Sequence, residues 1–215
     1  MQNLVTRFHL LLLAVTLAIT GVGAFRIPAD FVYLAHWVGS TADWLWPRTT
    51  IFVAPIVQLV LIGAFFTLGR ILTRNQYAKS QHILDPALTL LMTVVASIQL
   101  GLLLTGIGSD LDFIRVTAFG LGAVLLVLGI VLFEAERHTY AGLRMPWPVR
   151  SDRAWRIVHR MAGVACGVAG LALLAQAWFD TGLGLLILSC AGALLLPAAS
   201  AGFATWIFDA RRSSA

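Results

Sequence analysis

Six long runs of apolar residues, separated by short polar segments, dominate the pattern of this chain. Each run approaches the about 20 residues that cross a bilayer as a helix. None alternates polar and apolar positions as the strands of a membrane barrel do. Backbone inside lipid must close its own hydrogen bonds, so each run is expected to be helical. The predicted spans are Phe8–Phe25, Thr49–Leu68, Pro86–Gly106, Val116–Phe133, Met161–Phe179 and Leu183–Phe208. The predicted fold class is therefore all-α: a polytopic membrane protein with a bundle of six transmembrane helices.

Two of these runs carry local sequence signals near their ends. The first run follows Arg7 and ends in Val22-Gly23-Ala24, which is similar to a signal-peptide cleavage site. It is longer than the usual apolar region of a signal peptide, so an uncleaved first helix is favoured. In the third run, Asp85 is predicted to be the N-cap and Pro86 the first helical residue.

Composition agrees with a membrane protein. The chain is 59% hydrophobic and 12% charged, whereas a soluble domain carries about 25% charged residues. A soluble globule, a disordered chain and a disulfide scaffold are thereby excluded. The net charge of +5 is typical of basic loops beside a membrane. Membrane lipids are the expected partners, and direct nucleic-acid binding is not expected.

The basic residues are distributed unequally between the two sets of loops. Of the 15 Lys and Arg residues, only Arg26, Arg48 and Arg115 lie in loops on the side opposite the N-terminus. Basic residues collect in cytoplasmic loops. The prediction is therefore a multi-pass protein with both termini in the cytoplasm.

Candidate chemistry is confined to the ends of the spans. Every ionisable residue lies in a loop or within about a turn of a span boundary, which disfavours an ion or proton pathway. No nucleophile elbow, phosphate loop or zinc-protease motif is present. We therefore predict no catalytic residue and no cofactor. Two alternatives stay open: a small transporter, and an inner-face enzyme acting on lipid or peptide through Glu134, Glu136, His138 and His159.

The segment from Arg26 to Arg48, between the first two spans, is a candidate site on the outer side. His36 and Asp43 could pair there, or contribute to a metal site. Gly39 lies between them and permits a turn. The alternative is an aromatic loop lying on the lipid headgroups, which needs no ligand.

The segment before the fifth span is richer in polar chemistry. Gly142 permits a turn, and Pro146-Trp147-Pro148 favours a stiff, extended piece. From Asp152 onward the chain can be helical, with Asp152, Trp155 and His159 on one face. Its basic residues allow a simpler interpretation, a surface helix on anionic lipid.

Small residues continue this helix into the membrane. Gly163, Gly167 and Gly170 share one face and could let the helix approach a neighbour closely. Ordinary helix packing is the alternative, because glycine is common in membrane helices.

The inner segment resembles the SdpI family of bacterial membrane proteins. The resemblance rests on a G-x-R-x-P-W motif and a following W-x-x-x-H-R motif. Their residues are Gly142, Arg144, Pro146, Trp147, Trp155, His159 and Arg160. The outer segment, with His36, Gly39 and Asp43, is similar to a domain that often precedes it. On this basis residues 1–80 form a first part with the outer loop, and residues 81–215 form a four-helix SdpI-like part.

The resemblance implies an immunity protein rather than an enzyme. Such a protein protects a bacterial cell from a secreted antimicrobial peptide, and relays the presence of that peptide to a cytoplasmic transcriptional repressor. It further implies a location in the bacterial cytoplasmic membrane. The outer loop would then face the toxin peptide, and the inner loop would bind the repressor.

Overall fold

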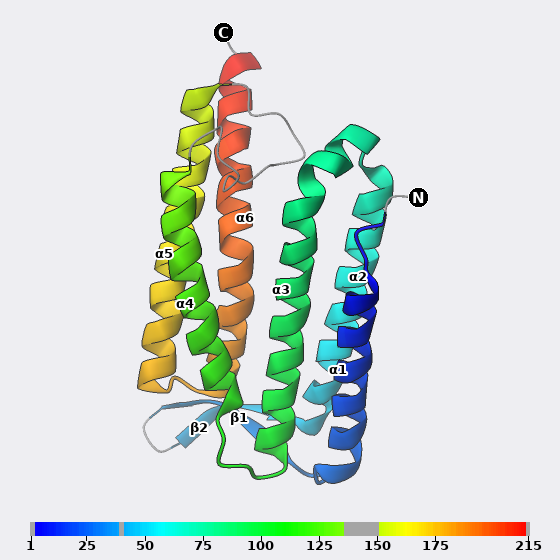
Figure 1. The fold of residues 1–215 in the computed structure, drawn as a ribbon. Coiled ribbons are helices and arrows are strands. Elements are labelled where there is room, and N and C mark those ends of the chain that lie inside the picture. The colour runs from blue at the N-terminus through cyan, green and yellow to red at the C-terminus, as the bar shows by residue number, and fades with distance from the viewer. Residues whose placement is uncertain (1–2, 39–40, 136–150, 214–215) are drawn as a thin grey trace. The chain divides into compact units, whose positions relative to one another are not determined.

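The computed structural model describes residues 3–38, 41–135 and 151–213, and these contain six helices long and apolar enough to cross a membrane. The prediction of an all-α membrane protein with six spans is confirmed (Figure 1). The helices are α1 (Arg7–Arg26), α2 (Val53–Ile71), α3 (Arg74–Gly106), α4 (Phe113–Glu134), α5 (Asp152–Phe179) and α6 (Leu183–Ser213). The orientation with both termini in the cytoplasm stays a prediction.

The segment between α1 and α2 is a β-hairpin followed by a short 3-10 helix. Strand β1 (Val32–Val38) pairs antiparallel with β2 (Thr41–Pro47), and η1 (Arg48–Phe52) leads into α2. β-Branched and aromatic residues favour a pleated surface, and seven Val, Thr, Tyr and Trp residues lie in the two strands: Val32, Tyr33, Trp37, Val38, Thr41, Trp44 and Trp46. The segment between the first two spans therefore contains a hairpin, and its predicted position on the lipid headgroups stays a prediction.

Helix α3 begins twelve residues before the predicted start, at Arg74 rather than Pro86. Thr73 is its N-cap, and a capping box joins Thr73 to Gln76. The prediction that Asp85 caps this helix is wrong, because the Thr73 cap already satisfies the helix start. Pro86 lies inside α3, and Figure 1 shows α3 changing direction near its beginning.

The chain divides into two compact units. Unit 1 comprises residues 1–117 and 180–187, and unit 2 comprises residues 118–179 and 188–215. The predicted organisation into residues 1–80 and 81–215 stays a prediction. Unit 1 contains the hairpin. Unit 2 contains Trp155, His159 and Arg160, which are the described residues of the inner motif, the name used here for the pattern that resembles the SdpI family.

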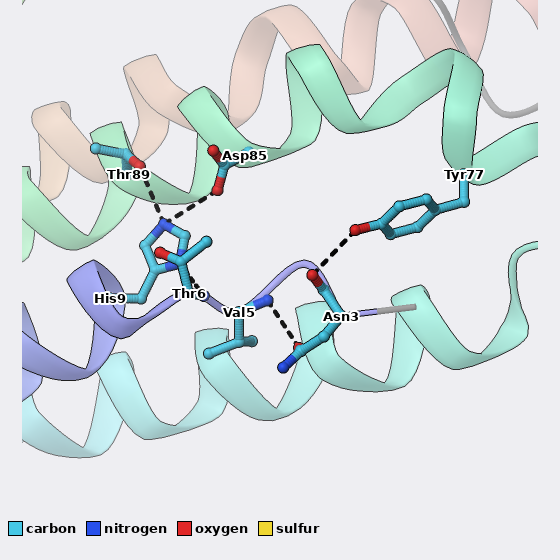
Figure 2. A network of polar contacts seen from close by, with 7 residues as sticks. All are labelled: Asn3, Val5, Thr6, His9, Tyr77, Asp85 and Thr89. Atoms are coloured by element: carbon cyan, nitrogen blue, oxygen red, sulfur yellow. Dashed lines mark hydrogen bonds and ion pairs between the residues drawn. The ribbon is translucent and has the colours of Figure 1, made fainter. Parts of the chain in front are cut away.

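In unit 1, helices α1, α2 and α3 pack against one another. A polar network fixes the beginning of α1 to α3 (Figure 2). The ring of His9 is fully buried, and its Nδ1 accepts the backbone N–H of Thr6 at 3.0 Å. In the neutral ring the proton is then on Nε2, which lies 3.0 Å from Oγ1 of Thr89 and 3.7 Å from the Asp85 carboxylate. Asp85 thus serves a contact between helices.

The segment before α1 is held at a second point of the same network. The hydroxyl of Tyr77, in the first turn of α3, donates to the backbone carbonyl of Asn3 at 3.0 Å (Figure 2). The backbone N–H of Val5 donates to Oδ1 of Asn3 at 2.9 Å. The chain therefore contacts α3 at two points: at Asn3, before α1, and at His9, in the first turn of α1.

In unit 2, α4 and α5 approach each other along glycines. A Cβ atom built on Gly163 would lie 2.7 Å from the carbonyl oxygen of Gly129, and one on Gly170 would lie 2.7 Å from that of Gly122. Both distances are shorter than real Cβ contacts, so only glycine permits this backbone approach. The predicted close approach of the fifth helix to a neighbour is confirmed at Gly163 and Gly170.

Candidate functional site

The β1–β2 hairpin is the candidate site of unit 1, and its two faces differ. Tyr33 pairs with Trp46 and Leu34 with Leu45, and the register shifts on either side of His36. Tyr33 and Ala35 are fully buried, whereas Leu34 is half exposed. Because side chains alternate across a strand, one face is anchored to the protein and the other is open.

The buried face of β1 rests on the last turns of α3. The hydroxyl of Tyr33 donates to the backbone carbonyl of Leu102 at 3.1 Å. A Cβ on Gly106 would lie 2.5 Å from the side chain of Ile27 and 3.1 Å from the Tyr33 hydroxyl oxygen. The glycine at the end of α3 therefore leaves the room that Ile27 and Tyr33 occupy.

The residues just before and within the first turn of α6 support the same face. Gly182 has a φ of +93°, a conformation that favours glycine. A Cβ on Gly182 would lie 2.8 Å from the carbonyl oxygen of Ala35, and one on Gly184 would lie 2.6 Å from the Cβ of Ala35. Two glycines therefore allow the α6 backbone to touch the strand, and the hairpin is fixed at the helix ends of unit 1.

Burial also changes the acid–base chemistry of Tyr33, which anchors the hairpin to α3. It raises the pKa of the Tyr33 hydroxyl to about 12, while the nearby positive charge of Arg48 opposes that rise. The Arg48 guanidinium donates to the backbone carbonyl of Ala24, at the end of α1. Tyr33 therefore stays a neutral hydrogen-bond donor over the physiological pH range.

His36 and Asp43 come together across the hairpin. Nδ1 of His36 lies 2.7 Å from Oδ1 of Asp43, and the side chains are 33% and 48% exposed. This contact is a hydrogen bond that becomes an ion pair when the imidazole is protonated. Within the described ranges no group of three His, Cys, Asp or Glu residues is placed to hold a metal ion. Gly39 lies outside the described residues.

The start of α5 carries the described part of the inner motif. Oγ of Ser151 accepts the backbone N–H of Ala154 at 3.2 Å, so Ser151 caps the helix. The rings of Trp155 and His159 stack at 3.9 Å between centroids, and Nδ1 of His159 lies 2.9 Å from the carbonyl oxygen of Trp155. His159 is buried and exposes only 1% of its surface.

The next residue of the motif contacts the end of α4. The guanidinium carbon of Arg160 lies 5.2 Å from the centroid of the Phe133 ring, a cation–π distance. The three described motif residues therefore form two contacts: the Trp155–His159 stack and the contact of Arg160 with Phe133. The other members, Gly142, Arg144, Pro146 and Trp147, lie outside the described residues, as do Glu136 and His138 of the enzyme alternative.

The residues that position the hairpin are not among those that the sequence pattern singles out. Tyr33, Ala35, Gly106, Gly182 and Gly184 form its contacts with α3 and α6. A signal is present in the glycines, since Gly106, Gly182 and Gly184 all lie at the ends of predicted spans. The strands that these glycines accommodate have only their β-branched and aromatic residues as a signal.

Comparisons with known proteins match the part of the chain that contains the inner motif. Residues 134–206 match the model of the SdpI/YfhL protein family. The chain is also 26% identical to "Immunity protein SdpI" of Bacillus subtilis (strain 168) over 130 residues, which are 60% of this chain and 61% of that protein. No solved structure matches the chain. The family match begins at the last residue of α4 and contains Trp155, His159 and Arg160. Residues 134–206 of the chain are therefore similar to the SdpI/YfhL protein family.

Proposed function

We propose that this multi-pass membrane protein is an immunity protein that protects a bacterial cell from a secreted antimicrobial peptide. The observation that carries the proposal is the 130-residue similarity to the immunity protein of Bacillus subtilis. That alignment covers 61% of the relative, and the family match covers the inner motif. The location proposed is the cytoplasmic membrane, with both termini inside and the hairpin outside.

In this proposal the hairpin is the element that meets the peptide. Its anchoring to α3 and α6 holds the His36–Asp43 pair on a rigid base. Binding surfaces held by rigid elements are more precise than mobile loops. A peptide arriving from outside would therefore meet a preformed surface.

The inner motif is proposed to relay the peptide's presence to a cytoplasmic repressor. The start of α5 has mixed chemistry, because a stacked Trp155–His159 pair lies beside Arg160. Lipid binding alone would be served by any basic residues. Aromatic residues and Arg are enriched in protein interfaces, so we propose that this face holds a protein partner.

The test of protection is survival. The full chain is expressed in a peptide-sensitive bacterial host, and growth is measured against a panel of secreted, membrane-active bacterial peptides. Increased survival against at least one peptide is the expected result. No gain with any peptide, at a membrane expression level confirmed by an epitope tag, overturns the proposed function.

The relay is tested separately by the position of its partner. Cytoplasmic proteins held by the full chain are captured by cross-linking at the membrane, and their fractionation is followed in Arg144→Ala and His159→Ala. Release of a transcriptional repressor into the cytoplasm is expected. The exposed Arg153→Ala is the matched control. A partner whose location is the same in all variants contradicts the relay.

A further inference from the structure

The open face of the hairpin is apolar. Val32, Leu34 and Leu45 are 47%, 49% and 51% exposed, and Leu34 lies directly opposite Leu45 in the register. Val32 lies opposite Pro47, which is also exposed. The two cross-strand pairs thus form one continuous patch, called here the hairpin patch.

Lipid does not account for the hairpin patch. The opposite face of β1 rests on the final turns of α3 and the first turn of α6 through Tyr33 and Ala35. The patch therefore faces away from the helix ends of unit 1. Lipid tails surround the sides of membrane helices, whereas the helix ends meet headgroups and water. Exposed apolar area of this kind is typical of an interaction surface.

The charges around the hairpin patch define its partner. Five exposed aspartates lie in β2 and in the loops at this end of unit 1, against three arginines. Arg48 is engaged with the carbonyl of Ala24. The aspartates are Asp30, Asp43, Asp110, Asp112 and Asp180. Complementary charge steers a partner and fixes its orientation, so a partner for this surface carries basic residues as well as apolar ones.

We propose that the hairpin patch binds a cationic amphipathic peptide. The peptide's apolar side chains lie on Leu34 and Leu45, and its basic side chains face Asp30 and Asp43. This inference deepens the proposed function and rests on it, since it names the chemical class of the peptide that the immunity protein meets.

The experiment measures binding to the full chain in nanodiscs of zwitterionic phosphatidylcholine. The probe is a fluorescent synthetic peptide of Leu and Lys, about 20 residues long and amphipathic as a helix. Its matched control replaces every Lys with Glu. Fluorescence anisotropy at low and high salt gives the Kd for each peptide, and empty nanodiscs give the lipid background.

Two double variants test the two halves of the surface. Leu34→Asn with Leu45→Asn is expected to weaken binding of the Lys peptide by about tenfold or more, which corresponds to about 1.4 kcal/mol. Asp30→Asn with Asp43→Asn is expected to weaken it at low salt and much less at high salt. Ile71→Asn changes an exposed residue at another helix end and is expected to leave binding unchanged.

Three outcomes of the binding measurements overturn the inference. If the Glu peptide binds as tightly as the Lys peptide, the surface does not select a basic peptide. Equal binding to empty nanodiscs assigns the signal to the membrane surface. Equal binding by the hairpin and control variants, with unfolding curves unchanged, shows that the hairpin patch does not bind the peptide.

The survival assay separates this inference from the proposed function. Protection that persists in both double variants refutes the patch alone, whereas binding without protection refutes the immunity function alone.

Discussion

Gln58 and Gln99 donate hydrogen bonds that link α3 to its neighbours: Gln58 joins α2 to α3, and Gln99 joins α3 to η1 and α1. Nε2 of Gln58 on α2 donates to the carbonyl oxygen of Met92 on α3 at 2.9 Å. Nε2 of Gln99 on α3 donates to the carbonyl oxygen of Ile51 in η1 at 2.9 Å, and to Oγ1 of Thr20 on α1 at 2.8 Å. Both side chains are buried. Polar groups inside a membrane need such partners, so these bonds fix how the first three helices align.

Replacing Gln99 by Met is expected to destabilise the protein by about 1–2 kcal/mol, because interhelical hydrogen bonds in membranes average about 0.6 kcal/mol each and two are lost. Gln58→Met, which loses one, is expected to cost about half as much. The measurement is unfolding of the purified protein by sodium dodecyl sulfate, followed by tryptophan fluorescence.

The pair of variants is its own control. Oε1 of each glutamine is buried and has no hydrogen-bond partner, so both substitutions remove one such acceptor. The difference between them therefore reports the donated hydrogen bonds. Equal losses, or a larger loss for Gln58→Met, would contradict this account.

The anchor of the hairpin predicts a pH dependence. The pKa of Tyr33 is raised from 10.0 to about 12, so the folded state retains the phenolic proton where the unfolded state loses it. The stabilisation is fully present below pH 10.0 and decreases as the pH rises towards about 12. Absorbance at 295 nm should show a late tyrosinate step that Tyr33→Phe removes, and a step completed near pH 10.0 would contradict the prediction.

Tyr33→Phe also isolates the hydrogen bond to the carbonyl of Leu102. The substitution keeps the ring among its neighbours and removes only the hydroxyl, so a loss of about 1 kcal/mol is expected at neutral pH. Tyr77→Phe is the matched control for the tyrosinate signal, since Tyr77 lies at the beginning of α3 and contacts Asn3 instead. The late step should persist in that variant.

The six spans could be predicted because hydropathy alone decides them. In lipid, a long apolar run has only helical backbone available to it, whatever its neighbours are. The contact of Trp155 with His159 follows from helical spacing as well, because residues four apart share a helix face. The contact of His36 with Asp43 is one of two interpretations that the sequence leaves open, and in the hairpin the two side chains lie 2.7 Å apart.

The hairpin itself depends on contacts between distant parts of the chain. Its register is fixed where Tyr33 reaches Leu102 and where Ala35 meets Gly182 and Gly184. No local pattern in the sequence predicts these contacts with α3 and α6. Two strands without such contacts are only marginally stable. The start of α3 could not be predicted for a different reason: Asp85 is a plausible N-cap, but the capping box of Thr73 and Gln76 begins the helix earlier.

The network at the beginning of α1 gives a prediction for Thr89. Thr89→Val keeps the shape and removes the hydroxyl that lies 3.0 Å from Nε2 of His9. The buried ring then has the Asp85 carboxylate at 3.7 Å as its contact on this side. A loss of about 1 kcal/mol in unfolding free energy is expected, measured by the same detergent titration.

A matched variant separates this contact from the general effect of valine. Thr67 lies on α2 of the same unit, is exposed, and bonds through Oγ1 to the carbonyl of Gly63 within its own helix. Thr67→Val is expected to change stability by about 0.5 kcal/mol or less. If both threonine variants lose the same stability, the bond between His9 and Thr89 contributes nothing beyond the local helix.

The glycines of α5 offer the sharpest comparison, because two of them differ only in what surrounds them. A Cβ on Gly163 would lie 2.7 Å from the carbonyl oxygen of Gly129 and 2.8 Å from the backbone nitrogen of Phe133, whereas a Cβ on Gly167 would meet nothing within 4 Å. Backbone atoms cannot move aside as a flexible side chain can, so α4 and α5 must separate to admit the methyl group of Gly163→Ala.

Gly163→Ala is therefore expected to destabilise the protein by about 1–3 kcal/mol through overpacking. Gly167→Ala gains helix propensity of about 0.5–1 kcal/mol without a clash, so it should be neutral or stabilising. Detergent unfolding of both variants gives the comparison. Because the substitutions are chemically identical and one helical turn apart, their difference measures the backbone approach of the two helices. Equal stabilities would mean that α4 does not lie against Gly163 in the membrane.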